Sequence, residues 1–161
     1  MKTYSAIDVA AWFLNKAASD ADAVHDISNM KLQKLVFFSQ LVSVLTFGED
    51  SPIHRNNTHA WDYGPVVPAL YKLLRPFGGS PLSFADAKVK AAFGPCAPQL
   101  IEDADALSVL NAVWNKFKSW SAIQLSMLTH REDSPWAVVY STAPYTVITP
   151  AIMRKHGFGR A

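Results

Sequence analysis

The sequence predicts a mainly α-helical fold with a small β-hairpin or short sheet. Three observations favour this class: several short polar segments resemble helix N-caps, apolar residues recur at helical spacing after them, and only one short stretch resembles a strand. The chain has 161 residues, of which 50% are hydrophobic and 12% aromatic, so it can fill a core without a disulfide or a metal. We expect a single compact domain of about six helices that spans residues 1–161.

The first two helices are predicted from their caps. Ser5 precedes an apolar set at helical spacing, and Asp8 follows three residues later, where its charge meets the positive end of the helix. Ser28 is a second cap, and its helix is expected to run to about Thr46 and end at Gly48.

The second helix is apolar almost all round. A helix with so narrow a polar face is normally central and buried. Lys31 and Lys34 interrupt the apolar residues on one side. We expect these two lysines to mark the face that meets water.

The middle of the chain lacks long helical patterns and is rich in turn residues. Asn56 and Asn57 are good turn residues, and residues 58–61 are predicted to form a short strand of a small hairpin. After a Gly-Pro break, residues 66–75 return to helical spacing. Residues 76–101 are rich in glycine and proline and predict a long connection with one helical turn, which is the expected place for a mobile or recognition loop.

The last third of the sequence is again helical. Acidic residues open a helix at 102–105 and Lys118 helps to close it, while residues 121–124 form a capping box for the next helix. Ser-Pro at 134–135 and Thr-Pro at 149–150 each place a cap before a proline at the first helical position. The final helix is expected to stop near residue 157.

Charge, cysteine content and hydropathy exclude several classes of protein. Fifteen basic and thirteen acidic residues leave a net charge of +2, too little for strong sequence-independent binding of nucleic acid. Cys96 is the single cysteine, so it can form neither an internal disulfide nor a zinc cluster, and it fits a reducing compartment. Without an apolar leader or an uninterrupted apolar span, the sequence predicts a cytoplasmic protein with no membrane contact.

No motif of catalysis is present, so we expect no enzymatic activity, no catalytic residue, no metal and no cofactor. The phosphate-binding glycine loops, the HExxH pattern and the GxSxG elbow are all missing. Two alternatives stay open, a small hydrolase that uses His130 with Glu132 or Asp133, and a metal site at His54 and His59. We favour a structural role for His130, in which it satisfies carbonyls at a helix end.

Three separated segments resemble one known family. They are Ile27–Phe38, Ala60–Tyr71 and Leu128–Trp136. In order and content they are similar to the Panacea domain of the SocA-like antitoxin family, often labelled phage-associated proteins, over about Ile7 to Ile152. The resemblance marks the following residues as a structural signature: Lys31, Leu32, Lys34, Trp61, Gly64, Pro65, His130, Pro135 and Trp136.

The resemblance implies a protein-binding function. Family members are similar to antitoxins that are encoded beside their toxins and neutralise them by direct contact, and one type delivers its toxin to a Clp-type protease. A cognate toxin encoded next to this protein is therefore the implied partner, with a Clp-type protease as a second one. Weak autoregulation by DNA binding is an alternative that requires one shared face for these basic residues: Lys31, Lys34, Lys116, Lys118, Arg154, Lys155 and Arg160.

We predict that the toxin docks near the Gly-Pro turn. Trp61 and Tyr63 flank this turn and belong to the residue types enriched in interface hot spots. Lys31 and Lys34 are expected beside them, and residues 76–101 are expected to form an adaptable rim. Tyr63 is the predicted exposed anchor.

Overall fold

Eight α-helices and one two-stranded antiparallel sheet make up residues 1–22 and 26–157, the part of the chain that the computed structural model describes. The mainly α fold with a small hairpin is therefore confirmed. There are more helices than the predicted six or so because five of them have only seven or eight residues. In chain order the elements are α1 (Ala6–Ser19), α2 (Asn29–Phe47), β1 (His59–Trp61), β2 (Gly64–Val66), α3 (Pro68–Leu74), α4 (Ala87–Phe93), α5 (Ala104–Phe117), α6 (Ala122–Thr129), α7 (Pro135–Thr142) and α8 (Pro150–His156).

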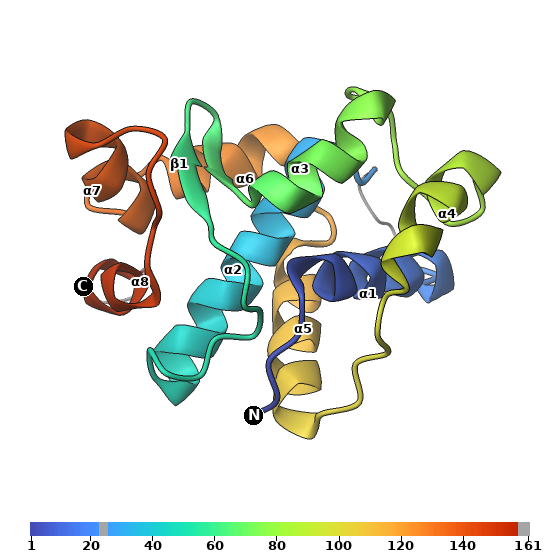
Figure 1. Ribbon diagram of the computed structural model, residues 1–161, viewed down its shortest axis with the longest axis horizontal. Coiled ribbons are helices and arrows are strands. Elements are labelled where there is room, and N and C mark those ends of the chain that lie inside the picture. Colours follow the sequence, from blue (N-terminus) through green and yellow to red (C-terminus); the bar gives the residue numbers. More distant parts are fainter. Residues whose placement is uncertain (23–25, 158–161) are drawn as a thin grey trace.

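Helix α2 lies at the centre of the molecule. It packs against α1, α3, α5, α6, α8 and β2, and the ribbon shows it surrounded by these elements (Figure 1). Most of its side chains, polar ones included, are buried. The prediction of a central, buried helix is confirmed.

The predicted exposure of Lys31 and Lys34 is wrong, because both residues are buried. The Lys31 Nζ donates a hydrogen bond to the Lys118 carbonyl at 2.6 Å, and the Lys34 Nζ donates to the Pro65 carbonyl at 3.2 Å. A long apolar stem lets a lysine cross a core while its ammonium reaches a polar atom at the core's edge. Sequence pattern alone does not reveal such a carbonyl, since it comes from a distant segment.

Side-chain caps hold the helix starts as predicted. Ser5 with Asp8 and Ser121 with Gln124 form complete capping boxes at α1 and α6. The Ser28 side chain caps α2, and the predicted Ser-Pro and Thr-Pro caps begin α7 and α8. None of the helices in the described ranges is long and apolar enough to cross a membrane.

The hairpin pairs Ala60 with Pro65, and its turn lies at residues 62 and 63. The strand at 58–61 was correctly placed, but the turn is not at Asn56 and Asn57. The Asn56 Oδ1 instead accepts a hydrogen bond from the backbone N–H of Ala6 at 2.8 Å, which ties this segment to the start of α1. The hairpin begins after this segment, and its second strand packs against α2.

Residues 76–101 are anchored to the core at several points, while most of their other side chains are exposed. The predicted helical turn is α4, and Leu82, Val89, Phe93 and Ile101 from this segment are buried. The backbone N–H of Leu82 also donates to the carbonyl of Ile27 at 2.7 Å. Apolar side chains spaced between the glycines and prolines explain this attachment.

Gly64 sets how closely the hairpin approaches α2. Its φ is +114°, and a Cβ placed there would lie 2.9 Å from the Lys34 Cε and 2.9 Å from the Thr129 Oγ1. Both the backbone conformation and the lack of space therefore require glycine at this position.

We expect Gly64→Val to destabilise the protein by at least about 2 kcal/mol, because it combines a strained φ with an overlap on two buried side chains. Gly79→Val is the control, since its Cβ would meet nothing within 4 Å. Urea denaturation followed by circular dichroism measures both variants. Equal stability of Gly64→Val and wild type would contradict the close approach.

Candidate functional site

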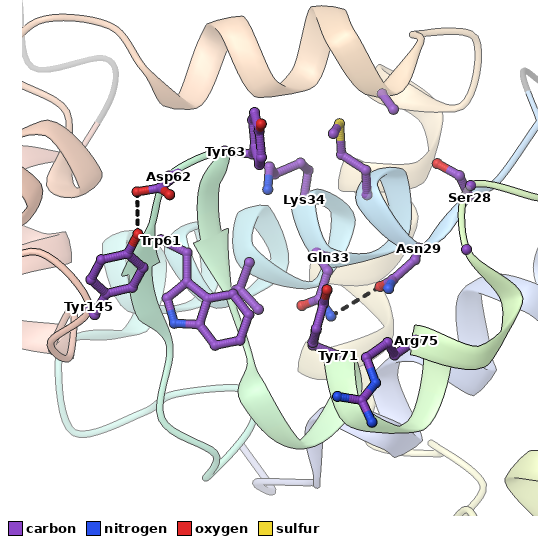
Figure 2. A pocket seen from close by; sticks show the side chains of 15 residues that line it. Ser28, Asn29, Gln33, Lys34, Trp61, Asp62, Tyr63, Tyr71, Arg75 and Tyr145 are labelled. Carbon is purple, nitrogen blue, oxygen red and sulfur yellow. Dashed lines mark hydrogen bonds between the residues drawn. The ribbon is translucent and has the colours of Figure 1, made fainter.

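The hairpin, α2 and α3 enclose a pocket of about 510 Å³. This volume lies within the range of small-molecule and side-chain binding pockets. We call it the hairpin pocket, and Figure 2 shows its wall. Its lining residues are Ser28, Asn29, Met30, Gln33, Lys34, Trp61, Asp62, Tyr63, Val66, Tyr71, Arg75, Gly78, Gly79, Ala122 and Tyr145.

Two hydrogen bonds from α2 hold the pocket's back wall in place. The Gln33 Oε1 accepts from the backbone N–H of Val67 at 3.0 Å, and the Lys34 Nζ donates to the carbonyl of Pro65. Neighbouring side chains on one helix therefore fix both the end of the hairpin and the start of α3. The Trp61 and Tyr71 rings meet edge to face, with centroids 5.0 Å apart, and form an aromatic wall between them (Figure 2).

Lys34 is the buried cation of the hairpin pocket, with a relative exposure of 1%. Burial lowers the pKa of its ammonium to about 8, because removing a charge from water disfavours the protonated form. At neutral pH the group still carries its positive charge. Its ammonium lies on the side of the pocket that faces the hairpin (Figure 2).

Asp62 is the acidic member of the wall, and two tyrosines already engage it. The hydroxyls of Tyr140 and Tyr145 donate to its Oδ1 at 2.6 and 2.5 Å. These hydrogen bonds lower the pKa of Asp62 and raise that of Tyr145 to about 12. The carboxylate is therefore ionised, and two donors already occupy its Oδ1.

Three large apolar side chains are exposed at the hairpin tip and on α6. Tyr63, at the hairpin tip, is 72% exposed, and on α6 the side chains of Ile123 and Met127 are 69% and 67% exposed. The Ser126 Oγ donates to the Tyr63 carbonyl at 3.0 Å, so the tip and α6 are in direct contact. We call these three residues the α6 ridge. Large apolar side chains that stay exposed on neighbouring elements are typical of interaction sites.

The structure brings three of the four predicted partner-binding residues together. Lys34, Trp61 and Tyr63 all line the hairpin pocket, and Trp61 is half-buried. Lys31 does not line it, because its ammonium points to the Lys118 carbonyl at the end of α5.

The signature residues His130 and Trp136 support the hairpin from behind. The Trp136 Nε1 donates to the carbonyl of Trp61 at 2.7 Å, and the His130 ring lies 4.0 Å from the Trp136 ring. His130 satisfies carbonyls at the end of α6, as predicted, through its backbone N–H, which donates to the carbonyls of Ser126 and Met127. Its buried Nε2 has no hydrogen-bond partner among the described residues. Burial, together with the positive charge of Lys34, lowers the pKa of His130.

The other signature residues have separate places. Leu32 is buried in the core, and Pro135 opens α7 at its first position. Gly64 and Pro65 form β2 against α2.

The alternative metal and proton-transfer sites do not assemble. His54 is 1% exposed, with a pKa that burial lowers to about 4, whereas the His59 Nδ1 lies 3.2 Å from the Tyr145 carbonyl. Over residues 1–22 and 26–157, no group of three or more His, Cys, Asp or Glu side chains could hold a metal ion. His130 packs on Trp136 and does not line the hairpin pocket.

The basic residues required for the DNA-binding alternative do not share one exposed face. Lys31 and Lys34 are buried, and Lys118 pairs with Asp20 and Asp22 at 3.2 and 2.7 Å. Arg160 lies outside the described residues. A footprint on phosphates needs accessible cations, so this set cannot provide it.

Sequence reasoning missed several members of the site. Tyr71 and Arg75 come from α3 and the 3₁₀ turn after it, and neither was among the predicted partner-binding residues. Ile123 and Met127 had a visible signal, because residues 122–129 contain more apolar side chains than one buried helix face can hold. Such a surplus indicates a helix that faces a partner as well as the core.

The burial of Lys34 leads to a prediction about pH. Its pKa is near 8 in the folded protein and near 10.5 in an unfolded chain, so the unfolded state binds more protons between these values. Stability should therefore rise with pH across this window, by up to roughly 3 kcal/mol. Below pH 8 the full cost of the buried charge remains, and Lys34→Met should be at least as stable as wild type.

Denaturant titrations of both proteins between pH 7 and 9.5 measure this difference. The variant should show a shallower rise with pH, which Lys31, whose pKa is also about 8, still produces in part. A Lys34→Met protein that is much less stable at pH 7, with an unchanged pH slope, would contradict the cost assigned to this ammonium.

Comparison with known proteins adds an independent finding. The family model described as antitoxin SocA-like, Panacea domain matches residues 32–137, from α2 into α7. No match was found among curated proteins or among solved structures. The matched range is narrower than the resemblance over residues 7–152, but it covers more than half of the chain and includes the hairpin, α3 and α6. The chain therefore belongs to the antitoxin SocA-like, Panacea domain family.

Proposed function

We propose that this protein is an antitoxin-like binding module that neutralises a cognate toxin by direct contact through the hairpin pocket and the α6 ridge. The observation that carries the proposal is the gathering of exposed apolar side chains at one place. Tyr63, Ile123, Met127 and Tyr145 are four of the six large hydrophobic residues that are exposed in the described part of the chain, and all four border the hairpin pocket or lie on α6 beside it.

The chemistry of the pocket favours binding over catalysis. Its walls are mainly aromatic and aliphatic, and its carboxylate, Asp62, is engaged by Tyr140 and Tyr145. A proton-transfer or nucleophilic site needs several convergent reactive groups. An apolar concavity beside an exposed aromatic instead suits a side chain from another protein.

The proposal also concerns the partners. We propose that the toxin is encoded beside this protein and that the protein neutralises it in the cytoplasm. The proposal includes delivery of the bound toxin to a Clp-type protease. Simple blocking and delivery differ in a measurable way, because only delivery shortens the lifetime of the toxin. A pulse-chase experiment with and without the protease separates the two.

Tyr63→Ala should weaken binding of the neighbour-encoded toxin at least tenfold while the melting temperature changes little. Truncating a hot-spot aromatic costs about 2 kcal/mol or more, and tenfold corresponds to about 1.4 kcal/mol. Ile123→Ser should have the same direction of effect, because Ile123 is also exposed. Isothermal titration calorimetry with the purified toxin measures both.

Leu100→Ala is the matched control for these variants. Leu100 is as exposed as Tyr63, at 72%, but it lies beside α1 and outside the hairpin pocket. This variant should bind the toxin like wild type and rescue growth in cells that express it. If Leu100→Ala loses binding while Tyr63→Ala and Ile123→Ser keep it, the toxin docks elsewhere.

A further inference from the structure

Lys34 is a buried ammonium with unused donor capacity. An ammonium has three N–H donors, and the hydrogen bond of this one goes to the Pro65 carbonyl at 3.2 Å. No carboxylate in the described part of the chain pairs with it. A buried charge is costly unless it is paired, so a lone ammonium at a pocket wall is suited to an incoming anion.

The pocket wall also carries a second positive charge, Arg75, and one negative charge, Asp62. Arg75 stands exposed on the same wall as Tyr71, without an ion pair among the described residues (Figure 2). The opposing charge, Asp62, accepts two tyrosine hydrogen bonds at one oxygen. The hairpin pocket therefore presents two positive groups that lack an ionic partner and one acidic group that is already engaged.

The surroundings of these charges are apolar. Trp61, Tyr71, Met30 and Val66 form much of the wall. A free inorganic anion would gain little from such walls, whereas an acidic residue with apolar neighbours would satisfy both features. Charge complementarity and apolar lining together specify the occupant.

We infer that the hairpin pocket receives an acidic side chain of the partner protein, flanked by apolar residues, with its carboxylate bound by the Lys34 ammonium, while Arg75 adds a positive charge on another part of the wall. This inference rests on the proposed function, because the α6 ridge beside the pocket would hold the rest of the partner. Lys34 is then a specificity residue: it recognises the carboxylate, despite the cost of its burial to stability.

A pair of blocked peptides tests the inference without the toxin. Acetyl-Phe-Glu-Phe-amide and acetyl-Phe-Gln-Phe-amide differ only in one charge, and binding is followed by ¹H–¹⁵N chemical-shift changes of the Trp61 indole and the Gly64 amide. The glutamate peptide should bind at least fivefold more tightly than the glutamine peptide. A glutamate peptide that lacks this preference, or no shift from either peptide at millimolar concentration, would overturn the inference.

Two lysine variants identify the responsible group. Lys34→Met should remove the preference for glutamate and leave the glutamine peptide unaffected. Lys31→Met is the matched control, because it also removes a buried ammonium from α2, but one that does not line the pocket. It should keep the preference. Loss in Lys31→Met, or persistence in Lys34→Met, would contradict the role of Lys34.

Toxin binding by the same variants separates this inference from the proposed function. If Tyr63→Ala abolishes toxin binding and Lys34→Met leaves it unchanged, the docking surface stands and the acidic anchor is wrong. If the peptide preference holds while Tyr63→Ala and Ile123→Ser bind toxin normally, the pocket recognises carboxylates but the proposed toxin surface is wrong.

Discussion

The contact between the hairpin and α2 is the constraint on which the site depends. Gly64 has no side chain, so the β2 backbone lies directly over Lys34 and Thr129, where a Cβ would approach within 2.9 Å. Gln33 and Lys34 then reach the backbone at Val67 and Pro65. Because these bonds fix both the hairpin and the start of α3, the space between them becomes a pocket with rigid walls.

Two hydrogen bonds hold the hairpin backbone, and the side chain at the hairpin tip lies outside the core. Trp136 holds the β1 backbone through Trp61, and Ser126 holds the tip through the carbonyl of Tyr63. The Tyr63 side chain has no place in the core and stays 72% exposed. A rigid backbone that presents an exposed aromatic loses little conformational entropy on binding, which favours a recognition role. Signature residues such as Trp136 and Gly64 thus help to hold the hairpin in place.

The sequence predicted the helical fold well because its caps act locally. Ser5, Ser28 and Ser121 sit where the helices begin, and their partners lie within three residues. The position of the lysines of α2 could not be predicted in this way, since their acceptors lie 31 and 87 residues away. For the same reason, the sequence did not predict that Tyr71 and Arg75 line the hairpin pocket, because the other walls come from distant segments. The surplus of apolar residues in α6, by contrast, is visible in the sequence.

The central claim is that a partner protein covers the hairpin tip and α6. Hydrogen–deuterium exchange on the protein alone and in complex with the neighbour-encoded toxin tests it most directly. We expect the added protection to fall on residues 61–66 and 122–129, with α1 and residues 97–101 unchanged. Protection confined to α1 and residues 97–101, with the hairpin and α6 exchanging as in the free protein, would contradict this account.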